Sequence, residues 1–258
     1  MSRVGDRFDA LRAEGRKAFV AFVTAGDPSL ERTVDVALAL EQGGADVIEL
    51  GVPFSDPLAD GPVIQRSSER ALARGVTLAS VLDAVRRIRA RGGTLPIVLF
   101  SYFNPLLAYG LERLCADARA AGVDGALVTD LPPEEAGEWL AHTRAHGLDT
   151  VFLAAPTSPE SRLARVAAAS RGFVYAVSRT GVTGERQALS DDASPLVARL
   201  RAHTSLPVVL GFGIATPEQV AAAEAVADGA VVGSALVRFL EEHPEGDVAQ
   251  RVRWLRGA

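Results

Sequence analysis

Two kinds of segment alternate along the chain. Short apolar runs rich in Val, Ile and Phe predict eight β-strands, at residues 18–23, 47–50, 97–100, 125–128, 150–153, 173–177, 207–210 and 230–232. The longer runs between them carry apolar residues at spacings of three and four, which predicts helices, for example at 29–42, 78–91 and 111–121. Strands that alternate with helices in this way lie parallel and are joined by right-handed crossovers.

Eight such units in 258 residues fit a (β/α)8 TIM barrel, whose typical length is about 250 residues. The alternative is a doubly wound open sheet, but Gly26-Asp27-Pro28 stands where its glycine-rich dinucleotide turn would follow the first strand. No linker, low-complexity tract or block of charge divides the chain. The sequence therefore predicts a single α/β barrel domain over residues 1–258, with extra N-terminal and C-terminal helices.

Composition removes several classes of protein. Hydrophobic residues make up 48% of the chain and charged residues 23%, as in soluble globular enzymes and unlike disordered chains. The net charge of −5 argues against a nucleic-acid binder, which needs a basic face. No apolar run approaches the ~20 residues of a membrane-spanning helix, and the N-terminus has no signal-peptide core. Because Cys115 is the single cysteine, no intrachain disulfide is possible, and we expect a cytoplasmic protein with a buried helix thiol.

Glu49 is the most informative polar residue, because its strand is otherwise apolar and barrel active sites lie at the C-terminal ends of the strands. Side chains alternate along a strand, so Glu49 shares a face with Val47, while Ile48 and Leu50 share the other. Neither face meets water, and we expect burial to raise the pKa of Glu49 toward neutrality. Such a pKa suits a group that both gives and takes a proton. The alternative is a Glu that pairs with an arginine near the strand end.

A Gly- and Pro-rich loop at residues 51–62 follows this strand and carries Asp56 and Asp60. Aspartates in turns are often caps, so spacing alone leaves a structural and a functional interpretation open. Two carboxylates in unlike surroundings, one apolar and one polar, would divide acid and base work between them.

Glycines after the last two predicted strands indicate an anion site. Residues 211–214 (Gly-Phe-Gly-Ile) follow the seventh strand, and Gly233 with Ser234 follows the eighth. Barrel enzymes often bind phosphate here, with backbone N–H groups and the start of a short helix. The alternative is a pair of simple turns.

Residues 178–184 (Ser-Arg-Thr-Gly-Val-Thr-Gly) have the composition of a lid that closes over a substrate, and equally that of an exposed loop. Aromatic residues gather at the predicted strand ends: Phe22, Phe100, Tyr102, Tyr175 and Phe212. Together they would suit a flat apolar substrate, although aromatic residues in barrels are also ordinary core.

The histidines do not indicate a metal centre. His142 and His146 are four residues apart, a spacing that resembles a pair of metal ligands. No cysteine or third ligand accompanies them, and a helix end of this kind favours cations in any case. We therefore predict no metal site.

The run at residues 49–62, Glu-Leu-Gly-Val-Pro-Phe-Ser-Asp-Pro-Leu-Ala-Asp-Gly-Pro, resembles the signature of the tryptophan synthase alpha chain family. Further family motifs match in order along essentially the whole chain, at residues 22–28, 102–105, 129–132, 178–184, 211–214 and 233–234. The resemblance implies a lyase of tryptophan biosynthesis. Its reaction would split indole-3-glycerol phosphate into indole and glyceraldehyde 3-phosphate by a retro-aldol step.

The resemblance also implies roles for individual residues. Glu49 matches the general acid/base, which protonates the indole ring carbon and removes the side-chain hydroxyl proton, and Asp60 matches the carboxylate that stabilises charge on the ring nitrogen. The phosphate site is matched by Gly184, Gly213, Gly233 and Ser234. The indole pocket is matched by Phe22, Phe100, Tyr175 and Phe212, with Tyr102 added to the substrate-binding set. Thr183 matches the lid residue that helps to order Asp60.

The family implies a partner as well. Positions that face a pyridoxal-phosphate-dependent beta chain, to which indole is passed, are matched by Pro53, Asp56, Asn104, Asp130 and Pro132. This chain should need no cofactor of its own, and the assembly should be a heterotetramer of two alpha and two beta chains. Three alternatives stay open: a stand-alone indole-3-glycerol phosphate lyase, another phosphate-binding barrel such as an isomerase, and a catalytically silent alpha-like subunit that only activates a beta chain.

Overall fold

The computed structural model describes residues 2–177, 192–211 and 213–258, and these residues form a sheet of nine parallel strands. They are β1 (Ala18–Thr24), β2 (Val47–Gly51), β3 (Ile97–Ser101), β4 (Gly125–Val128), β5 (Asp149–Val151), β6 (Leu153–Ala154), β7 (Val174–Val177), β8 (Val208–Gly211) and β9 (Gly229–Val232). Their order in the sheet is β5-β4-β3-β2-β1-β9-β8-β7-β6. The sheet therefore curls from β5 round to β6 as a nearly closed barrel.

The barrel closes through the chain itself at Phe152. The prediction of one strand at 150–153 is wrong in this respect, because the segment divides into β5, which pairs with β4, and β6, which pairs with β7. An interruption of strand pairing at a single residue leaves the hydrophobic pattern unchanged, so the sequence does not reveal it. The other seven strands lie within one residue of their predicted bounds, and the α/β barrel is confirmed.

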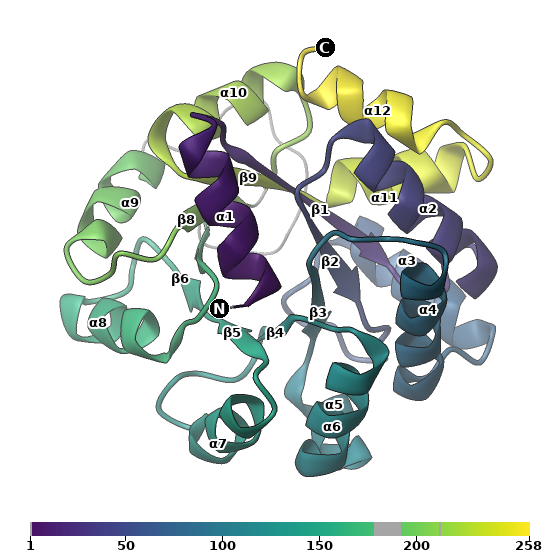
Figure 1. Ribbon diagram of the computed structural model, residues 1–258, viewed down its shortest axis with the longest axis horizontal. Helices are drawn as coiled ribbons and strands as arrows, with labels where there is room; N and C mark the ends of the chain where they lie inside the picture. Colours follow the sequence, from purple (N-terminus) through teal and green to yellow (C-terminus); the bar gives the residue numbers. More distant parts are fainter. Residues whose placement is uncertain (1, 178–191, 212) are drawn as a thin grey trace.

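Helices form a ring around the strands (Figure 1). In the described residues they are α1 (Arg3–Ala13), α2 (Leu30–Gly43), α3 (Pro62–Ala73), α4 (Leu78–Ala90), α5 (Phe103–Tyr109), α6 (Leu111–Ala121), α7 (Gly137–Ala145), α8 (Glu160–Ala169), α9 (Ala193–Arg201), α10 (Pro217–Val226), α11 (Ser234–Glu242) and α12 (Val248–Leu255). The predicted helices at 29–42, 78–91 and 111–121 correspond to α2, α4 and α6, and α1 and α12 are the extra terminal helices. Cys115 is buried on α6, as predicted. No helix among the described residues has the length and apolar character needed to cross a membrane.

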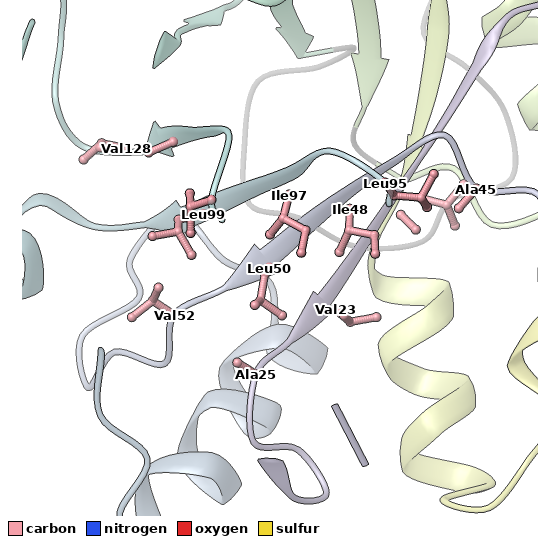
Figure 2. Close-up of a cluster of buried hydrophobic side chains, with 14 of the residues drawn as sticks. Val23, Ala25, Ala45, Ile48, Leu50, Val52, Leu95, Ile97, Leu99 and Val128 are labelled. Carbon is pink, nitrogen blue, oxygen red and sulfur yellow. The ribbon is translucent and has the colours of Figure 1, made fainter. Parts of the chain in front are cut away.

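Alternating side chains divide the strand residues between two cores. Val47 and Val98 belong to an inner core that fills the barrel. Ile48, Leu50 and Leu99 belong to an outer core between the strands and the helices, and Figure 2 shows them among the side chains of that cluster. Both faces of each strand are therefore buried, which is why parallel strands read as nearly continuous apolar runs.

Helix α1 covers the amino ends of the strands, where it crosses the centre of the view in Figure 1. Val4, Phe8 and Leu11 of this helix are buried in the inner core. Arg7 of α1 forms an ion pair with the buried side chain of Asp46, directly before β2. Because α1 fills this end of the barrel, a site is expected at the opposite end.

A second buried ion pair lies at the amino ends of the strands. The Asp124 Oδ2 accepts hydrogen bonds from the Ile97 amide at 2.8 Å and from Arg89 Nη2 of α4 at 2.9 Å. The pKa of Asp124 is raised, because burial outweighs the opposing effects of the Ile97 amide and the arginines. Arg89 therefore stabilises the barrel at the end that faces away from its carboxyl mouth.

Candidate active site

A cavity opens at the carboxyl ends of the strands. Its described lining consists of Phe22, Glu49, Ile64, Phe100, Tyr175, Gly213, Ile214, Val231, Gly233 and Ser234. These residues come from β1, β2, β3, β7 and β9, from α3 and α11, and from the segments that follow β8 and β9. The nearly closed sheet therefore brings residues from the whole length of the chain to one place.

Glu49 projects into this cavity from β2. In the sheet register it lies between Phe22 of β1 and Val98 of β3. Its side chain is fully buried, and neither carboxyl oxygen has a hydrogen-bond partner among the described residues. Burial raises the pKa of Glu49 to about 8, which confirms the expected direction. At neutral pH the group is therefore mostly protonated and is able to donate a proton.

Asp60 lies in the loop between β2 and α3, in more polar surroundings. The Tyr102 hydroxyl donates a hydrogen bond to Asp60 Oδ2 at 3.1 Å and accepts one from the Ala59 amide at 2.9 Å. The Gln65 side chain donates from Nε2 to the Asp60 carbonyl oxygen at 2.8 Å, which ties the loop to the first turn of α3. Burial raises the pKa of Asp60 to about 6, and the hydrogen bond from Tyr102 opposes that rise.

The two carboxyl groups differ in the way that acid/base chemistry requires. With pKa values of about 8 and about 6, Glu49 keeps its proton near pH 7 while Asp60 is mostly ionised. Burial raises the pKa of Tyr175 well above its ordinary value, and the charges of Glu49 and Asp60 raise it further. A proton donor in the cavity lining is thus combined with a carboxylate in the loop that follows the same strand.

Aromatic rings form one wall of the cavity. The Phe22 and Phe100 ring centroids are 5.0 Å apart, with the planes at 74°. Two strand-end glycines make room for such rings, because a Cβ at Gly51 would lie 2.8 Å from Phe22 Cζ and a Cβ at Gly211 would overlap the Tyr175 hydroxyl. The aromatic wall therefore depends on Gly51 and Gly211. Both belong to motifs noted in the sequence, but the sequence gives neither of them this role.

The other end of the cavity is polar. Gly233 caps the N-terminus of α11, and Ser234 is the first residue of that helix. Gly213 lies beside them in the lining. The free N–H groups and the dipole of a helix N-terminus favour an anion, and glycine lets the anion approach the backbone closely.

Seven lining residues are ones that the sequence assigns to the site: Phe22, Glu49, Phe100, Tyr175, Gly213, Gly233 and Ser234. Asp60 and Tyr102 are both outside the described lining, and the Tyr102 hydroxyl donates a hydrogen bond to Asp60. The predicted site residues Thr183, Gly184 and Phe212 lie outside the described residues, as does the proposed lid at 178–184.

Sequence reasoning missed three apolar lining residues, Ile64, Ile214 and Val231. Ile214 ends the Gly-Phe-Gly-Ile motif, so its place after β8 was a usable signal. Ile64 and Val231 have no such signal, since they look like any other core residue of a helix and a strand. In the part of the chain that is described, no group of three or more His, Cys, Asp or Glu side chains could hold a metal ion.

The residues expected to face a partner differ in exposure. Asp56, Asn104 and Asp130 are exposed, Pro132 is partly buried and Pro53 is buried. The Asp130 Oδ1 accepts a hydrogen bond from the Phe103 amide at 2.7 Å, which connects the segment after β4 to the start of α5.

Two large apolar side chains are exposed in the same segments. Leu58, 85% exposed, lies in the loop that carries Asp56, and Leu107, 51% exposed, lies on α5 with Asn104. The Phe54 and Tyr102 rings, 5.2 Å apart, join the loop to the end of β3. Large apolar side chains that are exposed in this way are candidates for contact with another protein.

Comparisons with known proteins point to one family. A family model described as tryptophan synthase alpha chain matches residues 8–255. The tryptophan synthase alpha chain of Solibacter usitatus is 56% identical over 245 residues, which cover 95% of this chain and 91% of that relative. The one from Geobacter sulfurreducens is 54% identical over 252 residues, 98% of this chain and 95% of the relative. A structure of Mycobacterium tuberculosis tryptophan synthase matches with a TM-score of 0.92 at 43% identity, and covers 99% of this chain and 97% of that chain.

Proposed function

This chain belongs to the tryptophan synthase alpha chain family, whose lyase reaction cleaves indole-3-glycerol phosphate, and we propose that Glu49 and Asp60 carry that reaction here. The observation that carries the proposal is the buried carboxyl group of Glu49, which lines the cavity and has no partner among the described residues. An unpaired buried carboxyl group is costly, and such groups cluster at active sites.

The first step is a proton transfer from the Glu49 carboxyl group to carbon C3 of the indole ring. The ring nitrogen then carries a positive charge. The ionised Asp60 carboxylate stabilises that charge in a site from which water is largely excluded, where electrostatic effects are strong. The hydrogen bond from Tyr102 holds the Asp60 carboxylate in place.

In the second step the Glu49 carboxylate takes the proton of the side-chain hydroxyl group next to C3. The oxygen lone pair forms the aldehyde carbonyl, and the carbon–carbon bond to C3 breaks. The bonding electron pair returns to the ring and neutralises the nitrogen. Indole and glyceraldehyde 3-phosphate leave, and Glu49 is again protonated, as its pKa of about 8 favours near neutral pH.

The two ends of the substrate fit the two ends of the cavity. The flat indole ring fits between Phe22, Phe100 and Tyr175. The phosphate group fits at the N-terminus of α11, beside Gly213, Gly233 and Ser234. Thr183, Gly184 and Phe212 complete the proposed substrate-binding set.

We further propose that the chain works as a single domain in a cytoplasmic heterotetramer of two alpha and two beta chains. The beta chain would hold pyridoxal phosphate and receive the indole, and this chain would need no cofactor. The beta-facing surface would consist of Pro53, Asp56, Asn104, Asp130 and Pro132, with the exposed Leu58 and Leu107 as its apolar centre.

Indole release from indole-3-glycerol phosphate tests the function. The purified chain is expected to release indole slowly alone, and about tenfold or more faster with a beta chain, a range typical of coupling between subunits. Full rate without the partner would identify a stand-alone lyase. No release under either condition would contradict lyase activity and leave a silent activating subunit.

Leu107→Asp is expected to abolish stimulation by the beta chain and to leave indole release by the chain alone within about twofold of wild type. A charge in the apolar centre of an interface costs about 2 kcal/mol or more of binding free energy. The measurement is indole release against beta-chain concentration. Trp254→Asp is the matched control, because Trp254 is 44% exposed on α12 at a distance from these loops. Equal loss of stimulation in both variants would contradict the proposed surface.

A further inference from the structure

Helices α3 and α11 pack against each other and against β1. Each contributes to the cavity with its N-terminal turn. Ile64 of α3 lines the cavity directly after the Asp60 loop, and Gly233 and Ser234 line it at the start of α11. The separation of these two helices therefore sets the distance between Asp60 and the anion-binding end of the cavity.

A side-chain network joins the two helices farther from the cavity, and Arg70 of α3 is at its centre. Arg70 Nε and Nη2 donate to Asp27 Oδ1 at 2.9 Å and Oδ2 at 2.6 Å, a bidentate pair. Its remaining Nη1 donates to Glu241 Oε1 of α11 at 2.8 Å. Arg66, one turn earlier on α3, lies 3.3 Å from the other oxygen of Glu241.

The network is partly shielded from water. The side chains of Arg70 and Glu241 are each 29% exposed, and that of Asp27 is 7% exposed. The planar guanidinium group donates hydrogen bonds in fixed directions. Arg70 therefore connects three segments: the loop after β1, helix α3 and helix α11. A buried hydrogen bond between Thr24 Oγ1 and Ser67 Oγ, at 2.6 Å, ties the end of β1 to α3 beside it.

We propose that Arg70, with Asp27 and Glu241, is a positioning residue that fixes the distance between the Asp60 loop and the phosphate-binding start of α11. This inference rests on the proposed function. Arg70 is not in the described lining of the cavity, so it acts through the two helices.

Rigid helices transmit the constraint. Glu241 follows Ser234 by seven residues, about two helical turns, so a shift at Glu241 moves the start of α11 with it. On α3, Gln65 holds the Asp60 carbonyl, so a shift of α3 moves Asp60. A misplacement of about 1 Å between reacting groups lowers a rate by as much as a hundredfold.

The test compares Arg70→Met with Arg89→Met in the full chain. Both substitutions remove a partly buried arginine from an aspartate, but Arg89, 17% exposed, lies at the opposite end of the barrel. Arg70→Met is expected to lower kcat/KM for indole-3-glycerol phosphate at least tenfold, with kcat reduced. Arg89→Met is expected to change kcat/KM by less than about twofold, because its aspartate does not touch the site.

Binding of glycerol 3-phosphate, measured by calorimetry, distinguishes a changed spacing between Asp60 and the start of α11 from a disrupted phosphate site. This ligand carries only the phosphate end of the substrate, so it would bind at the start of α11 without reaching Asp60. Its affinity is expected to stay within about twofold of wild type in Arg70→Met, because the start of α11 is intact. A parallel loss of glycerol 3-phosphate affinity would overturn the proposal, since the network would then merely support the phosphate site.

Two milder variants test the proposal in case Arg70→Met does not fold. Glu241→Ala removes the acceptor on α11 and keeps the Asp27 pair, so an intermediate loss of kcat is expected. Arg70→Lys keeps the charge without the fork, so it is expected to recover part of the loss. Wild-type kinetics in both variants would overturn the proposal. Absence of indole release by the wild-type chain would overturn the proposed function, and this inference with it.

Discussion

Glu49→Gln is expected to lower kcat for indole release by about a thousandfold, since the amide neither gives nor takes a proton and general acid/base catalysis contributes up to roughly four orders of magnitude. The side chain keeps its size, so the Phe22 and Phe100 wall and the phosphate end remain. Indole release is measured with the purified chain, alone and with a beta chain. Activity within tenfold of wild type would contradict the assignment of Glu49.

Glu224→Gln is the matched control for this variant. Glu224 lies on α10, and burial raises its pKa as well, against the opposing effect of Arg256. It is outside the described cavity lining, so its indole release is expected to equal that of wild type. A large loss of activity in Glu224→Gln would mean that a Glu-to-Gln change outside the cavity is enough to lower the rate, and would contradict the assignment of the loss in Glu49→Gln to its proton.

The same Glu49→Gln chain is expected to become more stable than wild type as the pH rises. Burial raises the pKa of Glu49 from its ordinary value of 4.5 to about 8 in the folded chain. Between these values the unfolded chain loses the proton and the folded chain keeps it, so wild-type stability falls by roughly 1.4 kcal/mol per pH unit from this group. Gln does not titrate. Urea unfolding of both chains at pH 5 and pH 8 measures the growing difference and shows that the inactive variant is folded.

Asp60→Asn is expected to lower kcat by about a hundredfold or more, the usual cost of removing one group that stabilises transition-state charge. The variant also changes the pH profile. Activity requires ionised Asp60 and protonated Glu49, so kcat/KM of the wild type is expected to fall below about pH 6 and above about pH 8. In Asp60→Asn the fall at low pH disappears and the fall at high pH remains.

Two comparisons make this result specific. The substrate phosphate also titrates near pH 6, so a fall at low pH that persists in Asp60→Asn would belong to the phosphate and would contradict the role of Asp60. Tyr102→Phe removes the donor that opposes the rise in the pKa of Asp60. Its acid limb is therefore expected to move to higher pH, with a smaller loss of kcat than in Asp60→Asn.

The sequence predicts those parts of the candidate site that depend on a few consecutive residues. Alternation along β2 places Glu49 on the face of Val47, and the structure confirms that this face fills the barrel. The glycine motifs after β8 and β9 meet at one end of the cavity, as expected for the carboxyl ends of neighbouring strands. These inferences hold because side-chain alternation and strand polarity are properties of a few consecutive residues.

The tertiary structure alone decided which distant residues meet. Three features depend on how the sheet closes: the break between β5 and β6 at Phe152, the room that Gly211 leaves for Tyr175, and the hydrogen bond from Tyr102 to Asp60. The hydrophobic periodicity of the sequence does not predict these contacts.

The pKa values and the network around Arg70 were also decided by the tertiary structure. Sequence predicts the direction of the shift at Glu49, but the difference between about 8 for Glu49 and about 6 for Asp60 follows from their burial and from the hydrogen bond of Tyr102. Arg70 and Glu241 are 171 residues apart and look like ordinary helix-surface charges in the sequence. Repeating backbone geometry thus determined the elements and their faces, whereas contacts across the barrel determined which polar groups lost water and which gained partners.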